Sequence, residues 1–99
     1  MIEIKDEKIV EMLAILAKCN FQKLITENVN GVKESFVFIA RKYRELGHQG
    51  RIYFVVIRNF RDQVAFLNPD NVLLIKDEWY ADFILQKIKE FVLELSLRD

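Results

Sequence analysis

The 99-residue chain carries one histidine and one cysteine, so few side chains could act as a nucleophile, a general base or a soft metal ligand. His48 stands between Gly47 and Gln49 with no cysteine or paired acid near it in the sequence, whereas zinc sites usually need three or four such ligands. Cys19 has no partner for an intrachain disulfide, and its helical apolar surroundings predict a buried, inert thiol. We therefore expect neither a metal nor a cofactor.

The remaining polar side chains do not form a catalytic motif either. Ser35 and Ser96 have no histidine nearby in the sequence, and the glycines of residues 47–50 are too few for a nucleotide-binding loop. Three acids could hold a hard cation, but they open the last predicted helix, where carboxylates stabilise the N-terminus: Asp77, Glu78 and Asp82. The sequence thus predicts a protein that is not an enzyme.

Arginine is concentrated in one stretch of an otherwise neutral chain. Between residues 41 and 61, six basic residues stand against one acid. Five of the chain's six arginines lie there: Arg41, Arg44, Arg51, Arg58 and Arg61. Arginine makes forked contacts with phosphate, and the interleaved Tyr43, Tyr53 and Phe60 could stack on bases. Nucleic-acid binding is therefore one predicted function, and ion pairing of these arginines within the chain is the alternative.

The elements that would position these side chains follow from hydrophobic periodicity. Helices are predicted at residues 5–20, 32–46 and 77–97, and strands at 51–58, 64–67 and 72–75. Residues 21–27 fit either a strand, which we favour, or a continuation of the first helix. We therefore predict an α+β fold in which a three-stranded antiparallel meander, with a fourth strand left open, is packed by three helices.

The order of the predicted strands rests on their composition and on short loops. Residues 52–57 are apolar without alternation, which is typical of a central strand that is buried on both faces. The loops on either side of residues 64–67 are short enough for hairpins, and Pro69 suits a turn. Residues 28–31 form a clear break, because asparagine and glycine tolerate positive φ.

Surplus apolar surface predicts self-association. Hydrophobic residues make up 52% of the chain, and the second half of the last predicted helix is more apolar than a helix on a small sheet requires. We expect a homodimer with Phe91, Leu93 and Leu97 at the contact. A non-enzymatic interaction protein is therefore the leading functional hypothesis.

Length and composition also indicate the number of domains, the thermal stability and the cellular location that we expect. The chain fits one domain, residues 1–99, with 30% charged residues but only two serines, one threonine and three glycines, a balance typical of thermostable proteins. The charged stretch from Glu3 to Lys8 is unlike a signal peptide, and the longest apolar runs are far shorter than the about 20 residues of a membrane span. We expect a cytoplasmic protein with no membrane contact.

Two resemblances extend this reading. Residues 38–43 (FIARKY) and 64–69 (VAFLNP) lie in a segment, 32–72, that resembles the downstream half of archaeal Holliday-junction resolvases. That family's magnesium site needs an acid-x-Lys motif on the preceding strand, which residues 21–27 lack, while Glu3-Ile4-Lys5 lies one helix too early. The resemblance thus implies a shared fold without nuclease activity. The composition resembles that of small proteins from hyperthermophilic archaeal filamentous viruses, which implies the host cell cytoplasm.

Overall fold

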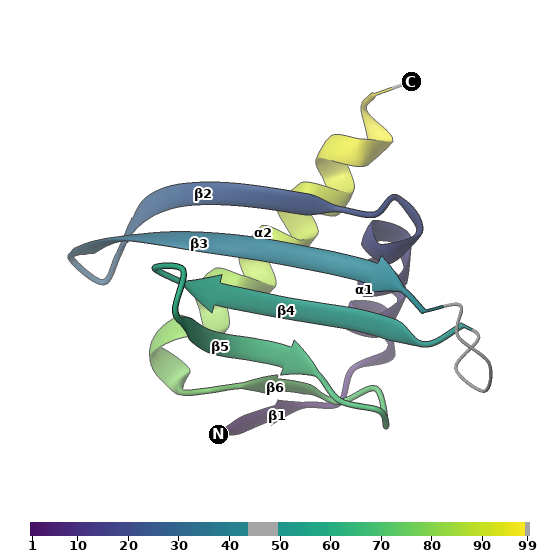
Figure 1. Ribbon diagram of the computed structural model, residues 1–99, viewed down its shortest axis with the longest axis horizontal. Helices are drawn as coiled ribbons and strands as arrows, with labels where there is room; N and C mark the ends of the chain where they lie inside the picture. The colour runs from purple at the N-terminus through teal and green to yellow at the C-terminus, as the bar shows by residue number, and fades with distance from the viewer. Residues whose placement is uncertain (44–49, 99) are drawn as a thin grey trace.

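The structure, a computed structural model, describes residues 1–43 and 50–98, which form two helices and six strands (Figure 1). The elements are β1 (Ile2–Ile4), α1 (Glu7–Lys18), β2 (Gln22–Val29), β3 (Val32–Lys42), β4 (Ile52–Arg58), β5 (Asp62–Leu67), β6 (Leu73–Ile75) and α2 (Glu78–Ser96). Neither helix is long and apolar enough to cross a membrane.

All six strands belong to one antiparallel sheet in the order β1-β6-β5-β4-β3-β2. β1 lies at one edge of the sheet, beside β6. The chain then passes through α1 to β2 at the opposite edge, and the strands from β2 to β6 are neighbours in sequence order. Both helices lie on the same side of the sheet (Figure 1). The molecule is therefore a two-layer α+β arrangement with one helix-covered face.

The α+β character is confirmed, but the predicted meander of three strands packed by three helices is wrong. Residues 32–42 form the longest strand, β3, and not a helix. Its buried residues recur every second position, at Phe36, Phe38 and Ala40, which is the period of a strand. The apolar residues between them, such as Ile39, also satisfied a helical spacing, because a strand that is apolar on both faces fits either period.

A two-residue turn between β2 and β3 explains why the chain continues as a strand. Asn30 and Gly31 have φ of 53° and 87°, and Val29 pairs directly with Val32. Left-handed residues at both central positions give a turn whose twist matches a hairpin. The Nδ2 of Asn30 also donates to the backbone carbonyl of Trp79 at 3.0 Å, which ties this hairpin to the start of α2.

The other predicted elements correspond to observed ones within a few residues. The strand at 21–27 is β2, the strands at 51–58, 64–67 and 72–75 are β4, β5 and β6, and the two outer helices are α1 and α2. The prediction missed β1, which has only three residues. Ile2 and Ile4 pair with Ile75 and Leu73 and so extend the sheet beyond β6.

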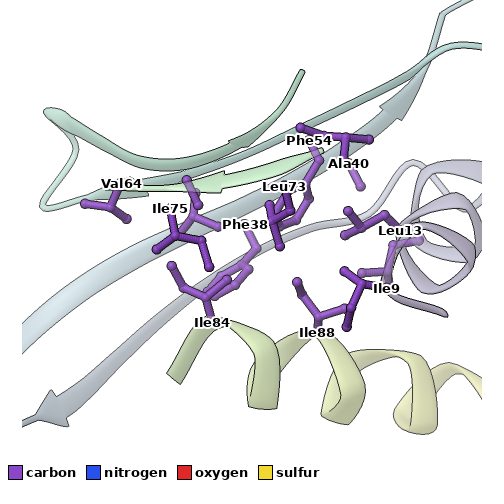
Figure 2. Packing of buried hydrophobic residues seen from close by; sticks show 14 of the residues in the cluster. Ile9, Leu13, Phe38, Ala40, Phe54, Val64, Leu73, Ile75, Ile84 and Ile88 are labelled. Atoms are coloured by element: carbon purple, nitrogen blue, oxygen red, sulfur yellow. The ribbon is translucent and has the colours of Figure 1, made fainter. Parts of the chain in front are cut away.

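The core lies between the sheet and the two helices. Phe38 and Ala40 of β3 and Phe54 of β4 face Leu13 of α1 and Ile88 of α2 (Figure 2). Aromatic rings extend this contact, since Phe38 meets Phe91 edge-on with 5.1 Å between ring centroids. No polar or charged side chain among the described residues is buried, so apolar burial is the main stabilising term.

Candidate functional site

The side of the sheet that faces away from the helices carries a second set of apolar side chains. Along each strand, alternate residues point to opposite faces, so the strand register assigns each residue to one face. We call the following residues the outer patch: Leu24, Val37, Ile39, Tyr53, Val55, Ile57, Phe66 and Leu74. Neither of the two helices lies on this side of the sheet (Figure 1).

The outer patch is continuous across five strands. One cross-strand row joins Leu24 of β2, Val37 of β3 and Ile57 of β4. The next row runs from β3 to β6: Ile39, Val55, Phe66 and Leu74. Tyr53 lies next to Val55 on the same face of β4, two residues earlier in the chain. The centroid of its ring is 6.0 Å from that of Tyr43. Directly opposed residues contact each other in antiparallel sheets, so these side chains form one surface.

Burial shows that this surface is separate from the core. Val55 is only 3% exposed, yet it does not belong to the core cluster that contacts the helices. Its cover therefore comes from its neighbours in the patch. Leu24 at the sheet edge is 54% exposed and Tyr53 is 38% exposed. Large contiguous apolar patches are unusual on monomeric proteins and indicate an interaction surface.

Polar side chains surround the patch. Glu3 pairs with Leu74 at one end, Gln63 pairs with Ile57, and Thr26 and Ser35 lie beyond Leu24, with their hydroxyls 3.1 Å apart. An apolar centre with a polar rim is the usual composition of a protein–protein interface.

Arg41 lies on the same face but is held by the chain itself. Its Nη1 donates to the carbonyls of Phe21 and Ala40 at 2.8 and 3.0 Å, and its Nη2 donates to the side chain of Gln22 at 2.8 Å. Arg41 thus borders the outer patch with most of its donors already used.

Arg58 is the centre of an ion-pair cluster at the other end of β4. Its Nη2 donates to Asp62, its Nη1 donates to the hydroxyl of Tyr80, and its Nε lies 3.8 Å from Glu34. The Tyr80 hydroxyl in turn donates to Glu34 at 3.3 Å. The hydrogen bonds to Asp62 and then Tyr80 raise the pKa of Arg58, and the bond from Arg58 lowers the pKa of Asp62. Arg58 is therefore engaged within the chain.

The described arginines of the predicted nucleic-acid surface do not gather at one end of β4. Arg51 and Arg41 lie near one end of β4, while Arg58 and the exposed Arg61 lie at the other, about 20 Å away for a seven-residue strand. Arg44 lies outside the described residues. Among the predicted nucleic-acid contacts, Arg58 forms ion pairs within the chain, and Arg41 donates hydrogen bonds to uncharged groups of the chain.

The predicted dimer residues on α2 divide between core and surface. Phe91 is 2% exposed and packs against Phe21 and Phe38, so it has almost no surface left for a partner. Leu93 and Leu97 are 60% and 78% exposed and remain available.

The residues considered for chemistry do not assemble into a site. Cys19 caps the end of α1 and is exposed, contrary to the prediction of a buried thiol, because α1 ends there. Asp77 caps α2 by accepting from the backbone of Trp79 at 2.9 Å. His48 lies outside the described residues. Within the described ranges, no group of three or more histidine, cysteine or acidic side chains could hold a metal ion.

Comparison with protein families, curated proteins and solved structures found no match for this chain. The outer patch is therefore identified from the geometry of the sheet alone. The sequence does not predict the outer patch, because residues 32–46 fit a helical period, which places Val37 and Ile39 on the surface of a helix. The signal was present in β4, whose residues are apolar on both faces although only one face is covered by helices.

Proposed function

We propose that this chain is a non-enzymatic interaction protein that forms a homodimer by packing the outer patches of two copies face to face. The observation that carries the proposal is the continuous row of Ile39, Val55, Phe66 and Leu74 on the sheet face opposite α1 and α2. Two sheets packed in this way interdigitate their side chains at a separation of about 10 Å, as in β-sandwiches.

The size of the face supports a second copy as the occupant. Six strands about 4.8 Å apart span roughly 25 Å, and β3 extends roughly 26 Å from Lys33 to Arg41. Because β1 and β6 are much shorter than β3, the face offers about 600 Å² per copy, at the lower end of the range of a specific interface of standard size. A twofold axis would place the apolar centres of both copies on each other and the polar rims together.

The mass of the protein in solution tests the proposal. Light scattering at micromolar concentration should give at least twice the 11.8 kDa of one chain. Val37→Lys places a charge in the patch between Leu24 and Ile57 and should lower this mass, because a buried unpaired ammonium is costly. Val37 does not contact the core cluster, so circular dichroism should remain that of the folded chain.

Ile15→Lys is the matched control, since it places the same charge at an exposed aliphatic side chain of α1, outside the outer patch. It should leave the mass unchanged. An unchanged mass for Val37→Lys would contradict the proposal, and a loss of mass for Ile15→Lys would place the contact on the helix side. Nucleic-acid binding through the arginines remains a prediction that no specific observation favours.

A further inference from the structure

β2 forms one edge of the sheet, and the alternation of its hydrogen bonds to β3 shows which backbone groups point outward. The backbone N–H of Ala40 donates to the carbonyl of Phe21 at 2.9 Å. Because hydrogen bonding alternates along antiparallel strands, the odd-numbered residues of β2 direct their backbone groups toward β3. The N–H and C=O groups of the even-numbered residues therefore point away from the sheet: Gln22, Leu24, Thr26 and Asn28.

The edge at β2 carries two charged side chains on its helix side, Lys23 and Glu27, but it lacks the proline, the bulge and the short length that often prevent strand addition. β2 is eight residues long, contains no proline, and pairs with β3 without a bulge. Natural proteins normally shorten, bend or cover such edges, since an exposed row of donors and acceptors accepts another strand. The edge therefore offers a template for pairing.

We propose that β2 pairs antiparallel with β2 of a second copy about a twofold axis at Ile25, and so joins two sheets into one. In this register Leu24 of each copy exchanges backbone hydrogen bonds with Thr26 of the other, and Ile25 faces Ile25 on the helix side. Gln22 faces Asn28 in the same way.

Charge complementarity selects this register. Lys23 of one copy faces Glu27 of the other, and the twofold axis repeats the pair. If the second strand were shifted by two residues in either direction, Lys23 would lie opposite Ile25 or Val29 and not opposite Glu27. The strand is thus complementary to itself in one register.

Existing ion pairs continue the charge pattern on both sides of the joint. Lys23 lies 3.1 Å from Glu94 of α2, and Glu27 lies 2.5 Å from Lys87 of α2. Across the contact between the two β2 strands, Glu94 and Lys23 of one copy are followed by Glu27 and Lys87 of the other copy. Acids and bases therefore alternate. The last turns of α2 also project past β2 (Figure 1), so a second copy at this edge would contact helix as well as strand.

The edge contact goes beyond the proposed function and does not depend on it. The outward groups of β2 lie in the plane of the sheet, whereas the outer patch faces along its normal. Both contacts are compatible in one assembly, which would then exceed a dimer.

Thr26→Pro tests the edge directly. It removes an outward N–H and leaves the β2–β3 bonds intact, and proline is tolerated on edge strands at such positions. Light scattering should show the mass of Thr26→Pro falling to half that of the wild-type protein. Thr26→Val, which keeps the N–H and loses only the hydroxyl near Ser35, should retain the wild-type mass. Circular dichroism of both variants checks the fold.

Lys23→Glu is a second test of the edge contact, and it leaves the backbone hydrogen-bonding groups of β2 unchanged. It faces Glu27 of the other copy with a like charge twice per joint, so dissociation should occur at about tenfold higher concentration. Thr26→Pro or Lys23→Glu with wild-type assembly would overturn the inference.

The two contacts can fail separately. If only the edge exists, Val37→Lys keeps the wild-type mass and Thr26→Pro gives single chains. If only the outer patch is used, Thr26→Pro keeps the wild-type mass and Val37→Lys gives single chains. If both exist, each variant is a dimer and the double variant is a single chain.

Discussion

Arg58 of β4 and Asp62 of β5 lie opposite each other in the sheet, and their side chains form an ion pair across the hairpin that turns at Phe60. The same arginine reaches Tyr80 at the start of α2. One side chain therefore joins two strands to the helix that covers them. Its guanidinium lies over the Tyr80 ring, 5.4 Å from the centroid.

We expect Arg58→Met to lower the free energy of unfolding by about 2 kcal/mol, because Asp62 and Tyr80 lose their shared donor and Glu34 loses its ion-pair partner. Urea denaturation measures the change. Arg61→Met, in the exposed turn, is the matched control and should change the stability by less than about 0.5 kcal/mol. Equal effects of the two substitutions would show that the ion-pair cluster does not stabilise the fold.

Acid should weaken the protein through carboxylates whose pKa is lowered in the folded state. The hydrogen bond from Arg58 lowers the pKa of Asp62, and that from Lys87 lowers the pKa of Glu90. Such groups contribute fully above their unfolded pKa values, near 3.8 and 4.5, and the contribution is lost as pH falls through the folded values.

Urea denaturation between pH 6 and pH 2 should therefore show stability falling below about pH 4.5. Asp62→Asn should reduce this dependence, because the substituted side chain does not titrate in this range. Asp70→Asn, in the exposed β5–β6 turn, is the matched substitution at a carboxylate outside the Arg58 cluster. A variant Asp62→Asn with the wild-type pH profile would contradict the assignment.

The fold was predictable where a segment obeyed one period and had clear ends. The helix of residues 77–97 was recognised because Asp77 is a good cap and Ile84, Ile88 and Phe91 keep a helical spacing. β3 was not, because Phe36, Phe38 and Ala40 on one face and Val37 on the other give an apolar run that satisfies both periods.

The outer patch could not be predicted for a related reason. Its members come from five strands, and only the strand order brings Leu24 and Leu74 onto one face. The edge position of β2 likewise depends on β1 pairing with β6, a contact across most of the chain. Sequence periodicity reports which face a residue occupies, not which strands are neighbours.

Heat stability is a prediction from composition that a melt can check. The charged content and the few flexible residues predict a midpoint above about 65 °C, outside the usual mesophilic range. The two-residue Asn30–Gly31 turn is consistent with this, since short loops are common in thermostable proteins. Circular dichroism during heating gives the midpoint, and a value below about 65 °C would remove the thermophilic interpretation.

The exposed position of Cys19 predicts a thiol that a reagent can reach in the folded protein. A disulfide reagent such as Ellman's reagent should modify one thiol per chain without denaturant, because the side chain at the end of α1 is accessible. Cys19→Ser should abolish the signal and keep the helical circular dichroism. Modification that requires denaturant would show instead that the thiol is covered in solution, for example by a second copy.

The Asn30–Gly31 turn should be sensitive to any side chain that resists a left-handed backbone. Gly31 has φ of 87°, and a Cβ there would meet no atom within 4 Å, so strain and not a clash decides the outcome. We expect Gly31→Ala to cost about 1 kcal/mol of unfolding free energy. Gly31→Asn should cost less, since asparagine adopts this region more readily. Urea denaturation of both variants measures the difference, and an alanine variant as stable as the wild-type chain would show that β2 and β3 do not depend on this turn.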